Sequence, residues 1–264
     1  MLALPRIDRR GWLALWAQRR RRKRAGGGVP RLNTGLASYW KLDEGGGTRF
    51  DSVGSNHLVE AFDVVSNEAG LIGFASSTSN NGSTDNFLYH ASPSGLDGSG
   101  AMTFSIWVKP CSYVGDLFVG VAVAVLAANW QKNLFGLQMS WSGSGYMYLL
   151  LNGAGGLYET SSIISDQWNH VVMVYRPTGI ATVYANGSLI MSVPIVDPVL
   201  GPLNIFVNGM AFPSGFAPWS PYPQYQFTGT VDEFGIWNRE LSIAEIATLY
   251  NSGAGLSLNQ INNQ

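Results

Sequence analysis

The stretch WNHVVMVYRPTGIATVYANGSLIMSV, from Trp168 to Val193, decides the fold of this 264-residue chain. Residues 171–175, 180–184 and 189–193 are three runs rich in β-branched, aromatic and other apolar residues, the composition of strands. Between the second and third runs, Asn186-Gly187 favours the type I′ turn of a tight hairpin, because both residues tolerate a positive φ. The stretch therefore predicts three consecutive antiparallel strands.

The same texture of short apolar runs separated by Gly, Asn, Asp, Ser and Pro continues over residues 32–255. Only 12% of the residues are charged while 32 are Gly, which favours many short strands over long helices with charged faces. We therefore expect one all-β domain, a two-sheet antiparallel sandwich. The further predicted strands are Ala37–Leu42, Phe87–His90, Thr103–Lys109, Val121–Ala127, Phe135–Trp141, Tyr146–Asn152, Gly156–Ser161, Leu203–Val207 and Gly229–Trp237.

One short helix is predicted near the end of this domain. Ser242 followed by Glu245 forms a capping box, and apolar residues at helical spacing follow it. The helix should span about residues 242–250 and end before Gly253. Residues 256–264 are then expected to form a C-terminal tail.

Charge divides the chain into an arm and a body. Residues 1–31 hold ten Lys and Arg but a single acid, a net charge of +9, whereas the rest has 6 bases against 16 acids, a net charge of −10. Such a split indicates a basic arm that serves a different partner from the body. The run GWLALWA leads straight into cations, the wrong flank for a secretory signal, and no apolar run approaches the roughly 20 residues of a membrane span.

The arm is predicted to be an anchor. Trp12 and Trp16 lie at helical spacing and suit a partner's apolar groove, while six consecutive cations suit an acidic surface. Phosphates would also attract the cations, and a membrane interface would accept the Trp pair. We favour docking onto an acidic protein assembly and expect no nucleic-acid contact. The anchor residues are Trp12, Trp16, Arg19, Arg20, Arg21, Arg22, Lys23 and Arg24.

Four motifs in order resemble the laminin-G-like, concanavalin-A-like jelly-roll family. They are LASYWKLDEGGGTRFDSVGSN from residue 36, MTFSIWVKP from residue 102, the hairpin stretch from residue 168, and GTVDEFGIWNRELSIAEIATLYNSG from residue 229. The resemblance covers about residues 35–255 and implies a jelly-roll sandwich. It implies binding more often than catalysis, since the family includes sugar-binding modules, adhesion domains and parts of viral particles.

The resemblance also implies one structural calcium ion, held between the turn after the first strand and the acid of the last strand. The matching positions are Asp51, Asn56 and Asp232, with Glu44 as a weaker candidate. Carboxylates, an amide and loop carbonyls suit calcium. Asp, Ser, Gly and Asn are equally what a tight turn needs, and the family's usual acid after the Asn is here His57. The plain turn therefore stays the main alternative.

Catalysis is not expected. The chain has no G-x-S-x-G, H-E-x-x-H or P-loop motif, and its three histidines, His57, His90 and His170, are scattered. Some jelly-roll relatives cleave polysaccharides with two carboxylates, but Asp232 and Glu233 are adjacent and should face opposite sides of a strand.

A second candidate binding surface is the uncharged stretch FPSGFAPWSPYPQYQF over residues 212–227. Its proline density excludes a central strand. Aromatic side chains on such a loop can anchor a protein partner or stack on sugar rings, and we favour the protein; a loop folded over the end of the sandwich is the alternative. The candidate residues are Phe216, Trp219, Tyr222 and Tyr225.

These features predict a non-enzymatic structural or adhesion protein of a bacteriophage virion. The fold usually works outside cells, and a virion component made in the host cytoplasm reaches the outside by lysis. We expect other virion proteins as partners through the arm, a cell-surface glycan as a further ligand, and a homo-oligomer or larger assembly. A host-encoded carbohydrate-binding module outside the cell is the alternative, and a polysaccharide-cleaving enzyme is the third.

Overall fold

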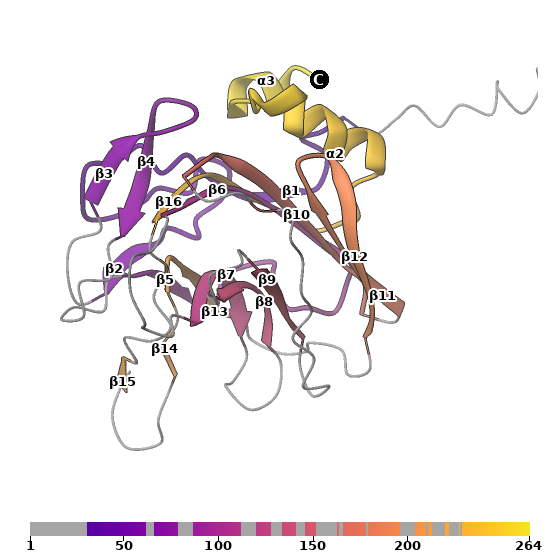
Figure 1. Ribbon diagram of the computed structural model, residues 1–264, viewed down its shortest axis with the longest axis horizontal. Helices are drawn as coiled ribbons and strands as arrows, with labels where there is room; N and C mark the ends of the chain where they lie inside the picture. The colour runs from indigo at the N-terminus through magenta and orange to yellow at the C-terminus, as the bar shows by residue number, and fades with distance from the viewer. Residues whose placement is uncertain are drawn as a thin grey trace, which may run out of the picture.

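The computed structural model describes residues 31–61, 66–78, 87–111, 120–127, 134–140, 146–151, 163, 166–177, 179–195, 204–209, 211–212, 220–221, 227 and 229–264. They form two antiparallel sheets packed face to face (Figure 1). In the order in which its strands pair, the eight-stranded sheet contains β12 (Ser188–Ile195), β11 (Gly179–Ala185), β10 (Asn169–Tyr175), β6 (Met102–Pro110), β16 (Gly229–Trp237), β4 (Phe74–Thr78) and β3 (Ser66–Ala69), and β1 (Leu36–Trp40) also pairs with β16.

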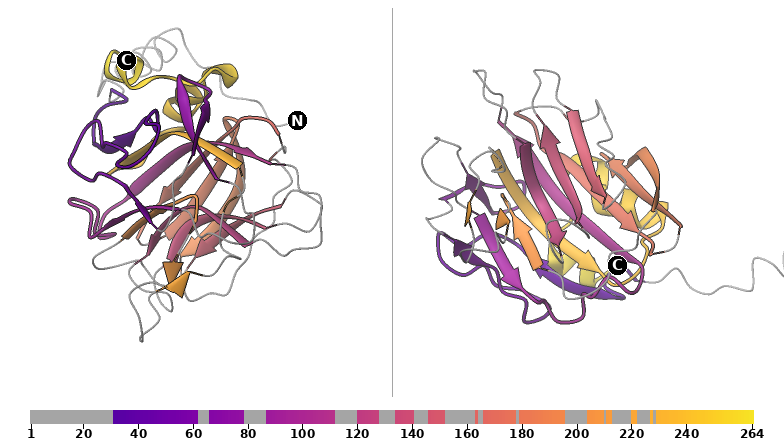
Figure 2. Two further views of the ribbon diagram at one scale, coloured as in Figure 1. Left: turned by 90° about the vertical axis from the view of Figure 1, so that its left-hand side faces the viewer. Right: turned by 90° about the horizontal axis from the view of Figure 1, so that it is seen from below.

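The six-stranded sheet lies below it in Figure 1, and Figure 2 shows it from below. A two-stranded ribbon, β14 (Ala211–Phe212) with β15 (Ser220–Pro221), projects beyond this sheet. The fold predicted from the sequence, an antiparallel two-sheet sandwich, is confirmed. The strands of the six-stranded sheet are, in order, β2 (Val59–Ala61), β5 (Phe87–Ala91), β13 (Asn204–Val207), β7 (Gly120–Ala127), β8 (Leu134–Ser140) and β9 (Tyr146–Leu151).

The hairpin stretch folds as its sequence indicates. Strands β10, β11 and β12 pair consecutively, and the Asn186-Gly187 turn has positive φ at both residues, 50° and 78°. Strand β10 is buried along its whole length, because helices cover one face and the second sheet covers the other. Side chains of these strands therefore contribute to two apolar clusters, one between the sheets and one beneath the helices.

Two apolar clusters hold the layers together. The first fills the space between the sheets and includes Trp40, Phe234, Leu88 and Ile205; the rings of Trp40 and Phe234 stack at 5.0 Å. The second lies between the eight-stranded sheet and the C-terminal helices, where Trp237 is fully buried. The helices thus cover the outer face of the eight-stranded sheet, and the outer face of the six-stranded sheet is the opposite side of the domain.

The predicted helix is α2 (Ile243–Tyr250), and the capping box of Ser242 with Glu245 is present. It ends at Asn251 in the left-handed conformation, followed by a 3-10 turn, Asn251–Gly253. A second helix, α3 (Leu258–Asn262), follows in the segment expected to be a tail. Leu258 and Ile261 are buried in the second cluster, so the folded body continues beyond residue 255 and has more than one helix.

Candidate functional site

Strand β16 pairs with two different strands along one edge, first with β4 and then with β1, and its two acidic residues lie between these pairings. Gly229–Val231 pair with β4, whereas Phe234–Trp237 pair with β1 along the same edge. Between them the register against β6 shifts, and Glu233 adopts a left-handed φ of 48°. Such a bulge inserts one residue into the strand and re-aims its side chains. Asp232 and Glu233 therefore stand where β4 and β1 part.

Both carboxyl groups point to the helix-covered side of the sheet. Asp232 Oδ2 accepts hydrogen bonds from the backbone N–H groups of Leu71 (2.9 Å) and Ile72 (3.0 Å) in the β3–β4 turn. Glu233 Oε2 accepts from the hydroxyl of Tyr39, which belongs to the helix-side cluster. The expectation that these neighbours face opposite sides, as strict alternation requires, is thus wrong: the bulge at Glu233 puts both on one side.

Burial governs the chemistry of this acid pair. Asp232 is 0% and Glu233 is 4% exposed, beneath residues 71–72 and 255–256. Burial raises the pKa of Asp232 to about 7 and that of Glu233 to about 8. Asp232 Oδ1 is buried with no hydrogen-bond partner among the described residues. The pair can hold protons near neutral pH, but a polymer chain has no access to it.

The turn containing Asp51 and Asn56 is locked by hydrogen bonds. Asp51 Oδ1 accepts from the N–H groups of Tyr39, Val53 and Gly54, each at 3.0 Å, and Oδ2 accepts from that of Asn56 at 3.1 Å. Burial alone would raise the pKa of Asp51, but these hydrogen bonds outweigh burial and lower it.

Asn56 is equally engaged. Its Oδ1 accepts from the N–H of Ser94 (2.8 Å), and its Nδ2 donates to the hydroxyl of Ser38 (2.8 Å). The turn that contains Asp51 and Asn56 lies along the edge of β1 that faces away from β16. On this edge the backbone N–H of Tyr39 donates to Asp51, and its carbonyl oxygen accepts from the N–H of Ser52. The structure therefore brings Asp51 and Asn56 together as parts of one turn.

The third predicted calcium ligand, Asp232, has its contacts elsewhere, with the β3–β4 turn. Within the described residues, no three His, Cys, Asp or Glu side chains form a group that could hold a metal ion. Glu44 Oε1 accepts from the N–H of Phe50 at 2.9 Å. Donors already surround the oxygens of Asp51, so this geometry fits the turn interpretation better than a calcium site, and calcium binding stays a prediction.

The root of the arm is fastened on the helix-covered side. The indole Nε1 of Trp237 donates to the carbonyl oxygen of Leu32 at 2.6 Å, and Leu32 is buried in the helix-side cluster. Arg239 donates to the carbonyl oxygens of Thr34 (2.6 Å) and Arg31 (3.2 Å) and forms an ion pair with Glu245 of α2. This clamp could not be predicted from the sequence, since Leu32 and Thr34 are each 205 residues from the side chain that holds them.

Most of the other predicted site residues lie outside the described part of the chain. They are the anchor residues Trp12, Trp16, Arg19, Arg20, Arg21, Arg22, Lys23 and Arg24, the aromatic-loop residues Phe216, Trp219, Tyr222 and Tyr225, and the predicted strand at 156–161.

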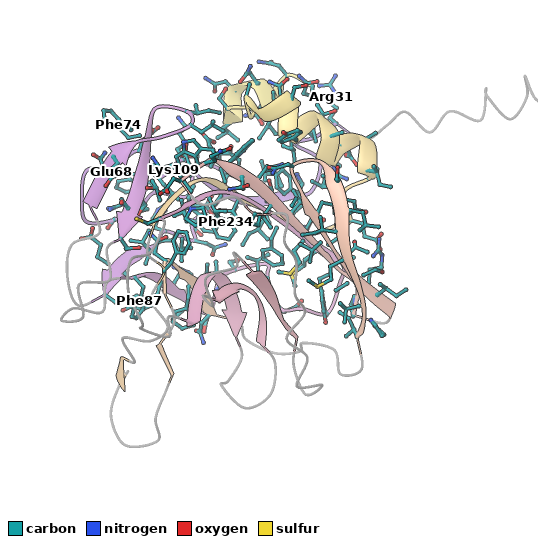
Figure 3. The ribbon with its side chains drawn as sticks, in the orientation of Figure 1. Arg31, Glu68, Phe74, Phe87, Lys109 and Phe234 are labelled. Atoms are coloured by element: carbon teal, nitrogen blue, oxygen red, sulfur yellow. The ribbon has the colours of Figure 1, made fainter. Side chains whose placement is uncertain are left out.

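An aromatic row on the outer face of the six-stranded sheet was not anticipated. Leu88 and Val207 belong to the core between the sheets, so their strand neighbours Phe87, Tyr89 and Phe206 lie on the other face of this sheet, where Phe87 and Phe206 are themselves buried, with 3% and 2% exposed. The ring of Phe87 lies 6.1 Å from that of Tyr89 and 5.9 Å from that of Phe206, both edge to face. Figure 3 labels Phe87 on this sheet. The sequence predicted strands at Phe87–His90 and Leu203–Val207 without assigning a role to their aromatic side chains.

The two antiparallel sheets packed face to face, with helices on the far side of the larger one, define a concanavalin-A-like jelly roll. The chain belongs to the concanavalin A-like lectin/glucanases superfamily, whose family model matches residues 81–247. No curated protein matches the sequence.

Solved structures share the fold at low identity. Domain 4 of an extracellular GH43 arabinanase from Geobacillus stearothermophilus, in complex with arabinotriose, superposes with a TM-score of 0.57 at 18% identity, covering 81% of this chain and 97% of that one. The binding domain of Paraclostridial Mosquitocidal Protein 1 gives 0.58 at 16%, covering 84% and 53%. Trypanosoma rangeli sialidase with the inhibitor DANA gives 0.62 at 16%, covering 92% and 38%.

This chain thus spans only about half of the toxin domain and less than half of the sialidase. At such identities the likeness concerns the fold. Of the helices in the described residues, none has the length and apolar character to cross a membrane.

Proposed function

We propose that this chain is a non-enzymatic adhesion protein of a bacteriophage virion. Its basic arm attaches it to other virion proteins, and its jelly-roll domain is displayed outward to bind a cell-surface ligand. Binding domains are common among the structures that share this fold, including the carbohydrate-bound arabinanase domain and the toxin binding domain. Fold alone does not specify function, but the position at which the arm joins the body supports an outward-facing domain.

The observation that carries the proposal is the position of the arm root. Leu32 and Thr34 are clamped against Trp237 and Arg239 beside α2, on the helix-covered side of the eight-stranded sheet. The outer face of the six-stranded sheet lies on the opposite side of the domain (Figure 1). An anchor that starts at one side leaves the other side free to face a ligand.

The burial of the acid pair supports a non-catalytic role. Glycoside hydrolysis needs two carboxyl groups that flank a glycosidic bond. Asp232 and Glu233 are 0% and 4% exposed, and their oxygens bond to the β3–β4 turn and to Tyr39. Their raised pKa values follow from burial between the two pairings of β16 and need no catalytic explanation.

A host-encoded carbohydrate-binding module is the second candidate. The arabinanase domain, which the chain covers over 97% of its length, was solved with arabinotriose bound. A module of that kind would bind its sugar without joining a particle. Purified particles therefore separate the two proposals, because antibody against the body should label their outer surface only in the virion case.

The test of the arm is deletion of residues 1–28 in the phage. We expect the truncated chain to fold, because it keeps the sandwich and the contacts of Arg31 and Leu32 with Arg239 and Trp237, and to be missing from purified particles. Two further variants separate the forces: Trp12→Ala with Trp16→Ala removes the apolar anchor, and Gln at positions 19–24 removes the charge. Particles that retain the truncated chain would refute the anchor.

The aromatic loop has its own test in the same particles. Trp219→Ala with Tyr222→Ala should weaken assembly or adsorption to cells, because truncating aromatic anchors removes most of their contact area. Normal assembly together with normal adsorption would assign the loop a structural role only.

A further inference from the structure

Strand β12 ends the eight-stranded sheet with an open edge. It pairs with β11 on one side, and no described strand pairs with its other side; both strands lie at the right-hand margin of the domain in Figure 1. Solvent reaches this strand, since Leu189 is 55% exposed and Ser188, Ser192 and Pro194 are also exposed. With eight residues, β12 is the longest of the strands that end the two sheets in pairing order, against six in β9, four in β3 and three in β2.

Other strand edges carry protection against pairing that β12 lacks. The outer edge of β1 is covered by the turn that contains Asp51, where Tyr39 uses both its N–H and its carbonyl oxygen. The end strands β2 and β3 are short and carry Glu60 and Glu68. Coverage, short strands and charge are the devices by which proteins prevent edge-to-edge association. The sequence of β12, SLIMSVPI, has no charged residue, so its edge is open to another strand.

The hydrogen bonds of β11 determine which backbone groups of β12 face the open edge. Asn186, directly after β11, donates its N–H to the carbonyl oxygen of His170 in β10 at 2.8 Å. Because the backbone groups of an antiparallel strand point alternately to its two neighbours, the even-numbered residues of β11 bond to β10. The odd-numbered residues Ala181 and Val183 therefore bond to β12.

Ser192 presents both of its backbone groups at the open edge. Val193 and Met191 are the register partners of these two β11 residues, so their N–H and C=O groups are used within the sheet. Ser192, between them, directs an N–H donor and a C=O acceptor outward, and Pro194 directs a carbonyl oxygen outward. Proline at this position costs the sheet no hydrogen bond, because the N–H that it lacks would face away from β11.

Apolar side chains along this edge are incompletely covered. Ile190, Met191 and Ile195 pack against the core between the sheets but are only partly buried. A further strand beside β12 would extend the sheet over these side chains and bond to the outward groups of Ser192. The edge therefore fits a strand that is uncharged and has apolar side chains on the core side.

A second copy of β12 meets these requirements. Two copies related by a two-fold axis through Ser192 form an antiparallel pair, in which the Ser192 residues of the two copies exchange two backbone hydrogen bonds. Met191 then lies beside Val193 of the second copy, and no charge meets its like across the axis. Pro194 is two residues from the axis, where its carbonyl oxygen is still available as an acceptor.

The same axis agrees with the position of the arm root. A sheet that continues across two copies needs an axis perpendicular to it, because a half-turn about that axis reverses the strand and leaves each face on its own side. The helix-covered faces of both copies then lie on one side, together with both arm roots, where Trp237 holds Leu32. Both outer faces of the six-stranded sheets lie on the other side (Figure 1). Two such arms can attach to one surface.

We infer that the β12 edge is a dimer interface, at which two copies of this chain join their eight-stranded sheets into one sheet across Ser192. The inference stands on the edge itself and does not depend on the ligand of the domain or on a particle. A contact of one strand pair is at the low end of interface sizes, below about 1,200 Å², so we expect a dissociation constant on the order of micromolar. Copies that their arms hold close together would pair more completely.

The experiment is sedimentation equilibrium of the full-length chain over a range of micromolar concentrations. Ser192→Lys and Ser192→Glu each place like charges opposite one another at the axis, whereas an equimolar mixture of the two variants places opposite charges there. Phe74→Lys is the matched control, because Phe74 is 54% exposed and lies on β4, near the other end of the same sheet (Figure 3). Trp12→Ala with Trp16→Ala tests the arm as an alternative contact.

We expect a monomer–dimer equilibrium in the parent, a dissociation constant higher by about tenfold or more in Ser192→Lys and in Ser192→Glu, and recovery of pairing in their mixture. Phe74→Lys and the Trp12, Trp16 double variant should dimerise like the parent. Thermal unfolding of the Ser192 variants should be close to that of the parent, since Ser192 is exposed. A parent that stays monomeric would overturn the inference. So would a dimer that Ser192→Lys leaves intact, a mixture that fails to pair, or a dimer lost with the two Trp residues.

Discussion

Asp232 and Glu233 are consecutive residues of β16, yet both carboxyl groups lie on the helix-covered side of the sheet. The left-handed conformation of Glu233 makes this possible, because it adds one residue to the strand between Asp232 and Gly235. The bulge ends the pairing with β4 and starts the pairing with β1 on the same edge. Asp232 then satisfies the N–H groups of the β3–β4 turn, and Glu233 satisfies Tyr39.

This pair should make stability fall as pH rises. Both carboxyl groups have a raised pKa in the native state, about 7 and about 8, against roughly 4 in the unfolded chain. Between pH 4 and 8 the native state therefore holds more protons, so the free energy of unfolding decreases with pH; the contribution is fully present below pH 4. Urea unfolding at pH 5 and pH 8.5 measures it. Asp232→Asn, which cannot ionise, should gain on the order of 1–3 kcal/mol relative to the parent between the two pH values.

Asp97→Asn is the control for this prediction. Asp97 is exposed, and hydrogen bonds from the hydroxyl and backbone of Ser99 lower its pKa, so it is ionised in both states throughout this range. Its variant should leave the pH profile unchanged. An Asp232→Asn variant whose difference from the parent is the same at both pH values would contradict the assignment of protons to the pair.

Asp51→Ala should destabilise the domain by about 2–4 kcal/mol, because it leaves four backbone N–H groups without their acceptor. Asp51→Asn keeps one carbonyl oxygen and should lose less. Thermal unfolding in calcium and in a chelator separates the two interpretations of this turn. We expect equal melting temperatures for the parent in both solutions; a lower value in chelator would support the predicted calcium ion instead.

The sequence predicted most of the fold because the signals were local. Asn186-Gly187 and the Ser242–Glu245 capping box each act within a few residues, and both have the predicted geometry. Strands β3 and β4 were missed because SNEA and FASST lack an apolar alternation. Helix α3 was missed because its capping residues, Ser257 and Gln260, were read as part of a polar tail.

The sites were harder to predict because they depend on contacts between distant residues. Asp51 and Asn56 are five residues apart and were predicted to share one turn, in which the N–H of Asn56 donates to Asp51 Oδ2. The single positive φ at Glu233, which reverses the expected direction of a carboxylate, has no sequence signal, since Glu is not a residue that favours it. The row of Val59, Tyr89 and Phe206 required the register of three separate strands.

Gly187→Ala should destabilise the β11–β12 hairpin by about 1–2 kcal/mol. Gly187 has a φ of +78°, and an added Cβ would lie 3.1 Å from Tyr250 Cδ1, on a ring that stacks 6.0 Å from Trp107. Urea unfolding measures the loss. Gly100→Ala is the matched control, because a Cβ there meets nothing within 4 Å and no positive φ opposes it. Equal effects of the two changes would mean that the turn tolerates a side chain.

Arg239→Ala should open the root of the arm. The guanidinium holds the carbonyl oxygens of Arg31 and Thr34 and pairs with Glu245 at 2.6 Å, so the backbone around Arg31 is tied to α2. A protease needs a locally opened segment, and its rate follows the free energy of that opening. We expect trypsin to cut after Arg31 about tenfold faster in Arg239→Ala than in the parent.

Arg239→Lys should fall between them, because an ammonium group lacks the planar fork that reaches several oxygens. Mass spectrometry follows the new fragment, and cleavage at residues 19–24 is the internal standard. Unchanged cleavage after Arg31 would mean that the bond from Trp237 to Leu32 suffices to hold the root.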